Sequence, residues 1–304
     1  MRRLSVFLFG LIAIASVCEA GNAQRYKDVV FEHLKIDSVQ YRVIDGRPLF
    51  MDVYQPDGDT AIIRPLVIFA HGGSFIHGNR KCDRLPAMCR YLAERGYVAV
   101  SIDYRLATLV RMASKASAFK VITKSVADGR ASVAWFLNDI EKGNTYRVDK
   151  NKIFFGGSSA GAILAEHLGF IDSASECNRA LCKAVTRCLP DSDALPAHAL
   201  RGIISLAGAI LDTNLIGANQ TSLLHIHTDA DAIVPYGNKR PMWGLAPFKL
   251  AGLQASRPRY ISQHLNFTEY VFPGLKHTPW DADDAIFETV MKQVVEYLDK
   301  ELRR

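Results

Sequence analysis

Apolar runs and amphipathic stretches alternate along the chain, and this alternation predicts an α/β architecture. Residues 65–70 (PLVIFA) are apolar throughout, as expected of a strand buried on both faces of a parallel sheet. A second such run follows at 97–102, after a helical stretch at 85–95. Other segments with strand character lie at 39–43, 49–54, 153–155, 202–206, 223–227 and 268–272.

The remaining amphipathic segments predict helices that cover this sheet. Apolar residues recur at near-helical spacing through 118–140 and again through 286–298. The dipeptide Asp45-Gly46 favours a hairpin between the first two strands. The stretch 172–200 is longer than a simple connection requires and contains three cysteines, so we interpret it as a small cap-like insertion beside the site.

The N-terminus has the pattern of a secretory signal peptide. Arg2 and Arg3 precede an apolar run at 4–17, and small residues follow at 18–23. We expect cleavage after Ala20 or Ala23, which leaves one domain over 24–304 and a secreted or periplasmic protein. A retained membrane anchor fits less well, because the run is shorter than the roughly 20 residues of a spanning helix. A lipid attached at Cys18 fits less well still, because Val17 precedes it.

Composition and charge narrow the possible classes of protein further. The chain has 304 residues, of which 49% are hydrophobic and 22% charged, so it is long enough for one substantial core. The net charge of +6 comes from scattered lysines and arginines, which argues against a nucleic-acid groove and leaves weak attraction to an anionic polymer open.

Five cysteines remain after signal cleavage, and an exported protein makes disulfides plausible. Five is odd, so at most two intramolecular bridges form. Zinc is disfavoured because paired C-x-x-C spacing is absent. The five cysteines are Cys82, Cys89, Cys177, Cys182 and Cys188.

The most informative segment is 154–161 (FFGGSSAG), where a strand meets a small-residue turn and then a helix. Only Ser159 has glycines two residues before and two after it, Gly157 and Gly161. This G-x-S-x-G form is typical of a nucleophile elbow, in which neighbouring side chains would collide with a strained turn. The pattern alone also occurs in ordinary loops, so the rest of the chain has to support it.

A serine nucleophile needs a base and a group that orients the base. His277 follows the last strand and precedes the closing helix, so we expect it to reach back over the sheet edge. Asp231, after the preceding strand, is the expected acid; Asp229 is the alternative, with a turn-capping role as its other interpretation. The chain order serine, aspartate, histidine is the one expected of an α/β-hydrolase.

A tetrahedral intermediate also needs hydrogen-bond donors for its oxyanion. Gly72 and Gly73 follow the buried strand at 65–70 and let backbone N–H groups come close, with Ser74 as an alternative donor. The N–H of Ala160, at the start of the next helix, is the second expected donor.

The combination of these motifs resembles the α/β-hydrolase esterases and lipases. The motifs are His71-Gly72-Gly73, the segment 103–106 (DYRL), the elbow at 157–161, Asp231 before Val234-Pro235, and His277. The likeness is strongest to secreted carboxylesterases of the bacterial acetyl xylan and feruloyl esterase type, and it covers roughly 37–300.

The resemblance implies a mostly parallel central sheet of about eight strands flanked by helices, with Ser159, Asp231 and His277 as the triad. It implies Gly72, Gly73 and Ala160 at the oxyanion site, and neither a cofactor nor a metal. The sequence departs from the family pattern at two positions: Thr228 replaces a common glycine of the acid loop, and Ser74 replaces the third glycine of H-G-G-G.

The expected activity is hydrolysis of a carboxylic ester, small or polymer-linked. A serine peptidase of the prolyl-oligopeptidase type is the alternative enzyme, and a non-catalytic binding protein with this fold is the alternative from another class. Phe75, Tyr236 and Trp280 are candidates to line a substrate pocket. Asp103 and Asp128 are interpreted as structural carboxylates, and the segment Asp128-Gly129-Arg130 as an internal ion pair or cap.

Overall fold

The computed structural model describes residues 23–82, 84–171, 179–189, 194–217 and 221–304. The expected signal peptide and Cys18 therefore lie outside the described residues, apart from Ala23. Cys177 and parts of the cap-like insertion lie outside them as well. Among the described residues, no helix is both long and apolar enough to cross a bilayer.

One eight-stranded sheet organises the chain, in the order β1-β2-β4-β3-β5-β6-β7-β10. All pairs from β4 to β10 are parallel, and β1–β2 and β2–β4 are antiparallel. All eight predicted strands are present, so the predicted mostly parallel sheet is confirmed. The strands are β1 (Leu34–Ile44), β2 (Arg47–Pro56), β3 (Arg64–Ala70), β4 (Val98–Ile102), β5 (Val148–Ser158), β6 (Gly202–Leu206), β7 (Ser222–Thr228) and β10 (Phe267–Phe272).

The antiparallel edge of the sheet begins with the predicted hairpin. Asp45 and Gly46 connect β1 to β2 with φ angles of 51° and 70°. Two consecutive positive φ angles are the requirement of a type I′ turn, whose twist matches that of the flanking strands. The dipeptide therefore determines where the chain reverses.

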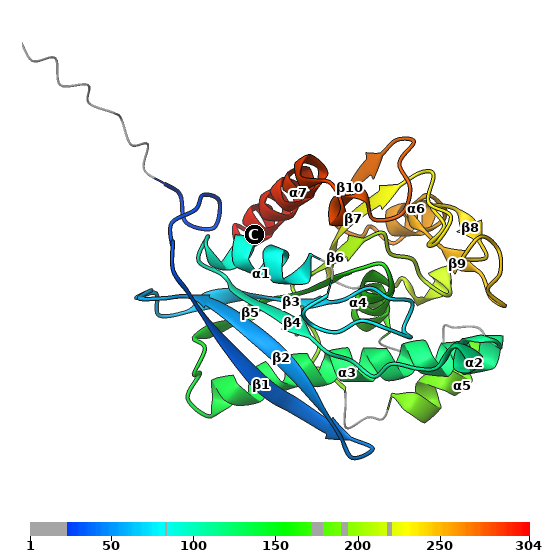
Figure 1. Cartoon of the computed structure of the whole chain (residues 1–304), viewed down its shortest axis with the longest axis horizontal. Coiled ribbons are helices and arrows are strands. Elements are labelled where there is room, and N and C mark those ends of the chain that lie inside the picture. The colour runs from blue at the N-terminus through cyan, green and yellow to red at the C-terminus, as the bar shows by residue number, and fades with distance from the viewer. Residues whose placement is uncertain (1–22, 83, 172–178, 190–193, 218–220) are drawn as a thin grey trace, which may run out of the picture.

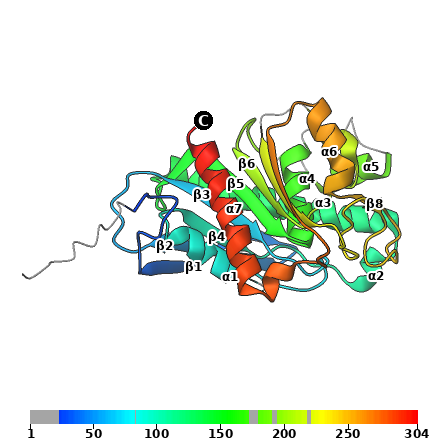
Figure 2. The same ribbon diagram turned by 90° about the horizontal axis from the view of Figure 1, so that it is seen from above.

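Helices cover both faces of the sheet (Figures 1 and 2). α1 (Leu85–Ala93) and α7 (Asp284–Leu302) lie on one face, and α3 (Lys115–Glu141) and α4 (Ala160–Phe170) on the other. Because side chains alternate along a strand, Val67 of β3 packs under α1 and α7 while Ile68 packs under α3 and α4. A strand that is buried on both sides reads as a continuous apolar run, which is why β3 was recognisable in the sequence.

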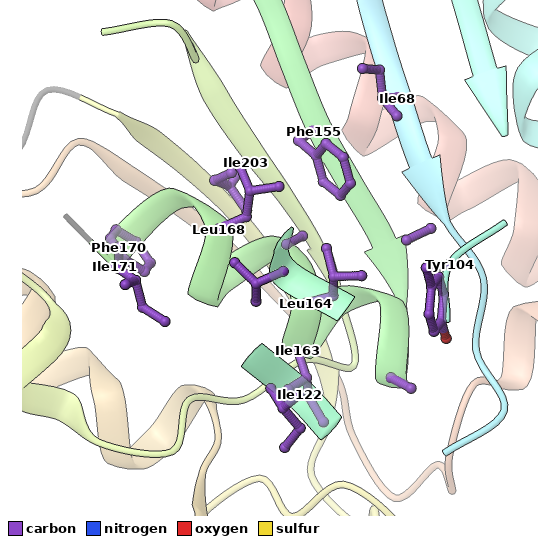
Figure 3. Close-up of a cluster of buried hydrophobic side chains, with 14 of the residues drawn as sticks. Ile68, Tyr104, Ile122, Phe155, Ile163, Leu164, Leu168, Phe170, Ile171 and Ile203 are labelled. Carbon is purple, nitrogen blue, oxygen red and sulfur yellow. The ribbon is translucent and has the colours of Figure 1, made fainter. Parts of the chain in front are cut away.

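Figure 3 shows the layer between the sheet and α4. Phe155 of β5 and Ile203 of β6 point toward Leu164 and Leu168, and Ile122 of α3 closes the cluster from the other side. Burial of these side chains fixes the position of α4, and with it the residue that starts the helix.

Several elements were not predicted from the sequence. They are α2 (Leu109–Met112), β8 (Asn238–Lys239), β9 (Leu250–Ala251) and α6 (Leu253–Ser262), with two 3-10 turns at Thr213–Leu215 and Pro279–Asp281. α6 contains Pro258 and has no dominant apolar face, so neither periodicity nor composition marked it as a helix.

The described part of the cap-like insertion contains α5 (Arg179–Cys188), which packs against α3. Cys82, Cys89 and Cys188 carry free thiols. Three free thiols leave at most one intramolecular bridge among Cys82, Cys89, Cys177, Cys182 and Cys188. Because Cys177 lies outside the described residues, disulfide formation stays a prediction.

Candidate active site

Ser159 occupies the sharp turn between the end of β5 and the start of α4. Its φ of 55° and ψ of −116° lie in a region that non-glycine residues rarely adopt. A Cβ atom on Gly157 would lie 2.3 Å from the carbonyl carbon of Gly161, and one on Gly161 would lie 2.0 Å from the carbonyl oxygen of Ala70. Both glycines of the motif are therefore required by backbone packing around the serine.

His277 connects Ser159 to Asp231. Its Nδ1 lies 2.6 Å from Oδ2 of Asp231, and its Nε2 lies 2.8 Å from Oγ of Ser159. A carboxylate only accepts hydrogen bonds, so Nδ1 carries the proton and donates it to Asp231. Nε2 then presents its lone pair to the serine hydroxyl, which is the arrangement that a general base requires.

The Asp231 carboxylate is fixed by the turn that follows β7. Its Oδ1 accepts hydrogen bonds from the backbone N–H groups of Ile233 and Val234, at 2.8 and 3.0 Å. The alternative acid, Asp229, instead accepts a hydrogen bond from the N–H of Gly274 at 2.6 Å and caps that turn. The structure thus brings Asp231, and not Asp229, to His277.

The expected oxyanion donors lie next to the elbow because β3 and β5 are parallel neighbours. Ala70 of β3 pairs in register with Gly157 of β5, so Gly72 and Gly73 come level with Ser159. Gly73 has a φ of +101°, and a Cβ atom there would lie 2.1 Å from a backbone oxygen of His77. No other residue fits this loop without moving its backbone.

The remaining oxyanion candidate is the N–H of Ala160, the first residue of α4. The first N–H groups of a helix have no partner within the helix, and they carry the positive end of its dipole. On the other side of the site, the Tyr104 hydroxyl donates to the His71 carbonyl at 2.8 Å, and its ring stacks on the His71 ring at a centroid distance of 4.3 Å. These contacts hold the glycine loop in place.

A cavity of about 490 Å³ opens at Ser159. Its lining is almost entirely apolar. It comes mainly from the loop after β3, α2 and the segment 241–250, with further residues from α3, α4 and the turn after β7. Phe75, Ile163 and Phe248 form part of its wall, and Leu109 and Leu245 at its edge are 66% and 80% exposed. An apolar group is therefore the chemistry that this cavity accepts.

Two histidines, His225 and His227, are buried beneath the triad. His227 lies under Asp231, and its Nε2 donates to the Val234 carbonyl at 3.1 Å. Its Nδ1 consequently accepts from Nε2 of His225, 3.3 Å away. Burial lowers the pKa of both imidazoles, so both are neutral.

Two further groups on α4 are fully buried. Burial raises the pKa of Glu166 to about 8, and its Oε1 accepts a hydrogen bond from Oγ of Ser205 at 2.6 Å. Burial lowers the pKa of His167 to about 4; its Nε2 accepts from the Leu211 N–H at 3.1 Å and its Nδ1 donates to the Ile163 carbonyl at 2.7 Å. His167 is thus a structural residue of the helix.

The two carboxylates interpreted as structural make ion pairs away from the triad. Asp103 accepts hydrogen bonds from the N–H and the guanidinium of Arg80, both at 2.8 Å. Asp128 is fully buried and pairs with Arg105 at 2.8 Å, not with its neighbour Arg130. Neither carboxylate contacts the Ser159 cavity.

Known structures and sequences resemble this chain. Two structures of esterase 2 from Thermogutta terrifontis, with propionate or butyrate bound, superpose with a TM-score of 0.64 at 19% identity, covering 87% of this chain and 94% of theirs. Residues 51–189 match the family model described as BD-FAE. Esterase LipC of Mycobacterium tuberculosis is 31% identical over 125 residues, which are 41% of this chain and 28% of that protein. The chain has the α/β-hydrolase fold.

Other curated relatives are much longer than this chain. The non-reducing polyketide synthase ascC of Acremonium egyptiacum is 32% identical over 134 residues, or 43% of this chain and 6% of the synthase. The chain therefore spans only a minor part of the length of these curated relatives.

The sequence left two parts of the candidate site unidentified. α2 and the segment 241–250 supply much of the cavity wall, although neither has a regular periodicity. The run of apolar residues between Pro241 and Phe248, in a region with few strand or helix signals, was the available clue. Of the aromatic candidates, Phe75 lines the cavity, whereas Trp280 is fully buried and its Nε1 donates to Oγ of Ser158 at 3.3 Å.

Tyr236, the third aromatic candidate, is also absent from the cavity wall; its ring packs edge-on against His227. No cluster of metal-ligating side chains exists among the residues that the structure describes. None of the described residues of α5 lines the Ser159 cavity.

Proposed function

We propose that this protein hydrolyses carboxylic esters through an acyl-enzyme intermediate on Ser159. The observation that carries the proposal is the continuous pair of hydrogen bonds from Asp231 through His277 to Ser159, at the edge of an apolar cavity. The esterase relatives support it. The polarity of both hydrogen bonds is the one that a serine nucleophile requires.

The first half of the reaction acylates the enzyme. Oγ of Ser159 attacks the ester carbonyl carbon while its proton passes to Nε2 of His277. The carbonyl oxygen becomes an oxyanion beside the N–H groups of Gly73 and Ala160; one such donor is worth roughly 2.7–4 kcal/mol to the transition state. The C–O bond then breaks, and His277 returns the proton to the leaving alcohol.

The second half regenerates the enzyme. A water molecule gives a proton to His277 and attacks the acyl carbon, and the serine leaves with that proton as the carboxylic acid departs. Asp231 stays ionised throughout and holds the imidazole in the tautomer with the proton on Nδ1. The protein's own side chains supply every proton transfer in this sequence.

The cavity supports an apolar acyl group. Its lining, which includes Phe75, Ile163 and Phe248, suits an uncharged acyl chain better than a charged one, and its volume of about 490 Å³ is in the range of organic ligands. The structurally similar esterase 2 has been solved with propionate and with butyrate bound, and both have an apolar acyl chain.

Hydrolysis of 4-nitrophenyl butyrate by the purified protein tests the proposal. Ser159→Ala should abolish the reaction, and Ser158→Ala is the matched control because its side chain faces Trp280 and not His277. A phosphonate probe should add one adduct mass, located on Ser159. Turnover by Ser159→Ala at the wild-type rate would disprove the assignment, and cleavage of a peptide 4-nitroanilide in preference to the ester would favour a peptidase.

We also propose that residues 1–23 direct export, on the strength of the charge, apolar length and small-residue pattern described above. N-terminal sequencing of the protein recovered after expression in a bacterial host tests this. A mature terminus at residue 21 or 24 is the expected result, and an intact Met1 in the soluble fraction would contradict it.

A further inference from the structure

A second cavity, of about 460 Å³, lies outside the catalytic site and is surrounded by positive charge. The turn of the β1–β2 hairpin, the segment 105–111, α3 and the end of α5 form its walls. Among the described residues that line it, Asp45 is the one carboxylate. The lysines and arginines in the wall are Arg47, Arg105, Arg111, Lys120, Lys124 and Arg187.

Among the described residues, only Arg105 of these cations has an ion-pair partner. Its guanidinium pairs with the buried Asp128 and donates to the Lys124 carbonyl. For the other five side chains, the described part of the structure contains no ion pair. Lys120 and Lys124 are also one helical turn apart on α3, where like charges repel. The cavity therefore concentrates uncompensated positive charge, and an anion placed in it would relieve the repulsion.

The shape and the remaining lining indicate what kind of anion fits. Arginine guanidinium groups bind carboxylates and phosphates with two parallel hydrogen bonds. Arg47, Arg111 and Arg187 border this cavity, and none of them has an ion pair with a described residue. Ile44, Leu106 and Val121 contribute apolar surface between the charges. The volume is in the range of organic ligands and far exceeds that of one simple ion. The matching ligand is an organic molecule that carries several carboxylates or phosphates.

The basic cavity and the Ser159 cavity share a wall. In α2, Arg111 lines the basic cavity, whereas Leu109 and Met112 line the cavity at Ser159. One short helix thus separates the two. A ligand that occupies the basic cavity therefore lies against the helix that also lines the Ser159 cavity.

We propose that the basic cavity binds the anionic part of the substrate, a chain with repeated carboxylate or phosphate groups, while its ester enters the apolar cavity at Ser159. The role in catalysis rests on the proposed esterase function, but binding does not. The two can be measured separately.

Calorimetric titration of the full chain with trigalacturonate, tripolyphosphate and maltotriose tests the binding step. The trisaccharide of uronic acids and the phosphate chain distinguish the two sources of anionic groups, and the neutral sugar is the control ligand. We expect at least one anionic probe to bind, with an affinity that falls as salt is added, and maltotriose not to bind. Binding should persist in Ser159→Ala, because the serine lies in the other cavity.

A double variant locates the binding site. Lys124→Gln with Arg187→Gln removes two unpaired charges from the cavity wall and should weaken binding about tenfold. Lys142→Gln with Lys183→Gln is the matched control: it removes the same charge at the end of α3 and from α5 without touching the cavity. Equal weakening in both double variants, or no binding of either anionic probe by the wild type, would overturn the proposal.

Kinetics with an acetyl ester of the probe that binds then test its role. The cavity double variant should raise KM for that ester with little change in kcat, and should leave hydrolysis of 4-nitrophenyl acetate unchanged. If the wild type hydrolyses the neutral ester but the cavity double variant leaves KM for the anionic ester unchanged, the inference fails and the esterase function stands. If no ester is hydrolysed, the esterase function fails, and the binding measurement in Ser159→Ala still decides the anion site.

Discussion

Nε2 of His227 lies 3.7 Å from Oδ2 of Asp231, the same carboxylate oxygen that accepts the hydrogen bond from His277. The His227 imidazole is buried and neutral, and it donates to the carbonyl of Val234. The N–H of Val234 in turn donates to Asp231. His227 thus supports the turn that orients the acid, and it acts on the reaction only through Asp231.

Replacement of His227 by Phe should therefore impair catalysis more than its distance from Ser159 suggests. The variant leaves the Val234 carbonyl without its partner and loosens the Asp231 turn. We expect kcat for 4-nitrophenyl butyrate to fall about tenfold, which corresponds to roughly 1.4 kcal/mol of transition-state stabilisation. His167→Phe is the control, because it removes an equally buried imidazole that does not contact the triad: it should lower the unfolding free energy and leave kcat unchanged. Equal kcat values in the two variants would refute a positioning role for His227.

The two aspartates after β7 should respond differently to the same change. Asp231→Asn places an amide against Nδ1 of His277, favours the wrong imidazole tautomer and should lower kcat by roughly 10³ to 10⁴. Asp229→Asn keeps an oxygen that can accept from the N–H of Gly274, so its kcat should stay within a few-fold of wild type. Steady-state kinetics of both variants, with circular dichroism to check folding, makes the comparison. A larger loss of kcat in Asp229→Asn than in Asp231→Asn would show that Asp229 is the acid that orients His277.

The sheet was predictable because burial on both faces leaves a clear signal in local sequence. β3 and β4 are fully buried, and each reads as a short, largely apolar run. Ser159 was also recognisable, since the flanking glycines are required by contacts within the elbow and with the adjacent end of β3. In both cases the physical constraint acts on residues that are close together in the chain or repeat with a fixed period.

The parts that the sequence did not reveal depend on contacts between distant segments. Asp128 pairs with Arg105, 23 residues away, because α3 carries it under the loop after β4, whereas proximity in sequence favoured Arg130. The cavity wall at 241–250 has no regular secondary structure except the two-residue strand β9 that begins at its end, so no periodic pattern in the sequence indicates it. The basic cavity combines a hairpin turn with α2, α3 and α5, so its charges appeared scattered along the sequence.

Packing at the elbow predicts a sharp contrast between two glycine substitutions. Gly161→Ala would place a Cβ atom 2.0 Å from the carbonyl oxygen of Ala70, and backbone cannot yield as a side chain does. We expect a loss of several kcal/mol in the free energy of unfolding, or no soluble protein, as for other cases of overpacking. Gly237→Ala is the control, since its Cβ atom would meet only the end of the Gln254 side chain at 3.2 Å. Urea unfolding of both variants checks this, and similar stabilities would show that the elbow tolerates a methyl group.

Glu166 predicts a pH dependence of stability. Burial raises the pKa of Glu166 from 4.5 to about 8, so the folded protein keeps this proton over a range in which the unfolded chain has lost it. The stabilisation from the bound proton is complete below about pH 4.5 and is lost as the pH rises toward 8. Its contribution to the unfolding free energy should fall by up to ~1.4 kcal/mol per pH unit within that window.

Glu166→Gln isolates this contribution, because the amide resembles the protonated carboxyl and can still accept from Ser205. Urea unfolding of wild type and variant at pH 5, 6.5 and 8 should show the wild type losing stability relative to Glu166→Gln as the pH rises. Glu141→Gln, at the exposed end of α3, should follow the wild type at every pH. A constant difference between wild type and Glu166→Gln across the three pH values would mean that the carboxyl is already ionised in the folded protein at pH 5, and that the hydrogen bond from Ser205 outweighs the cost of burying its charge.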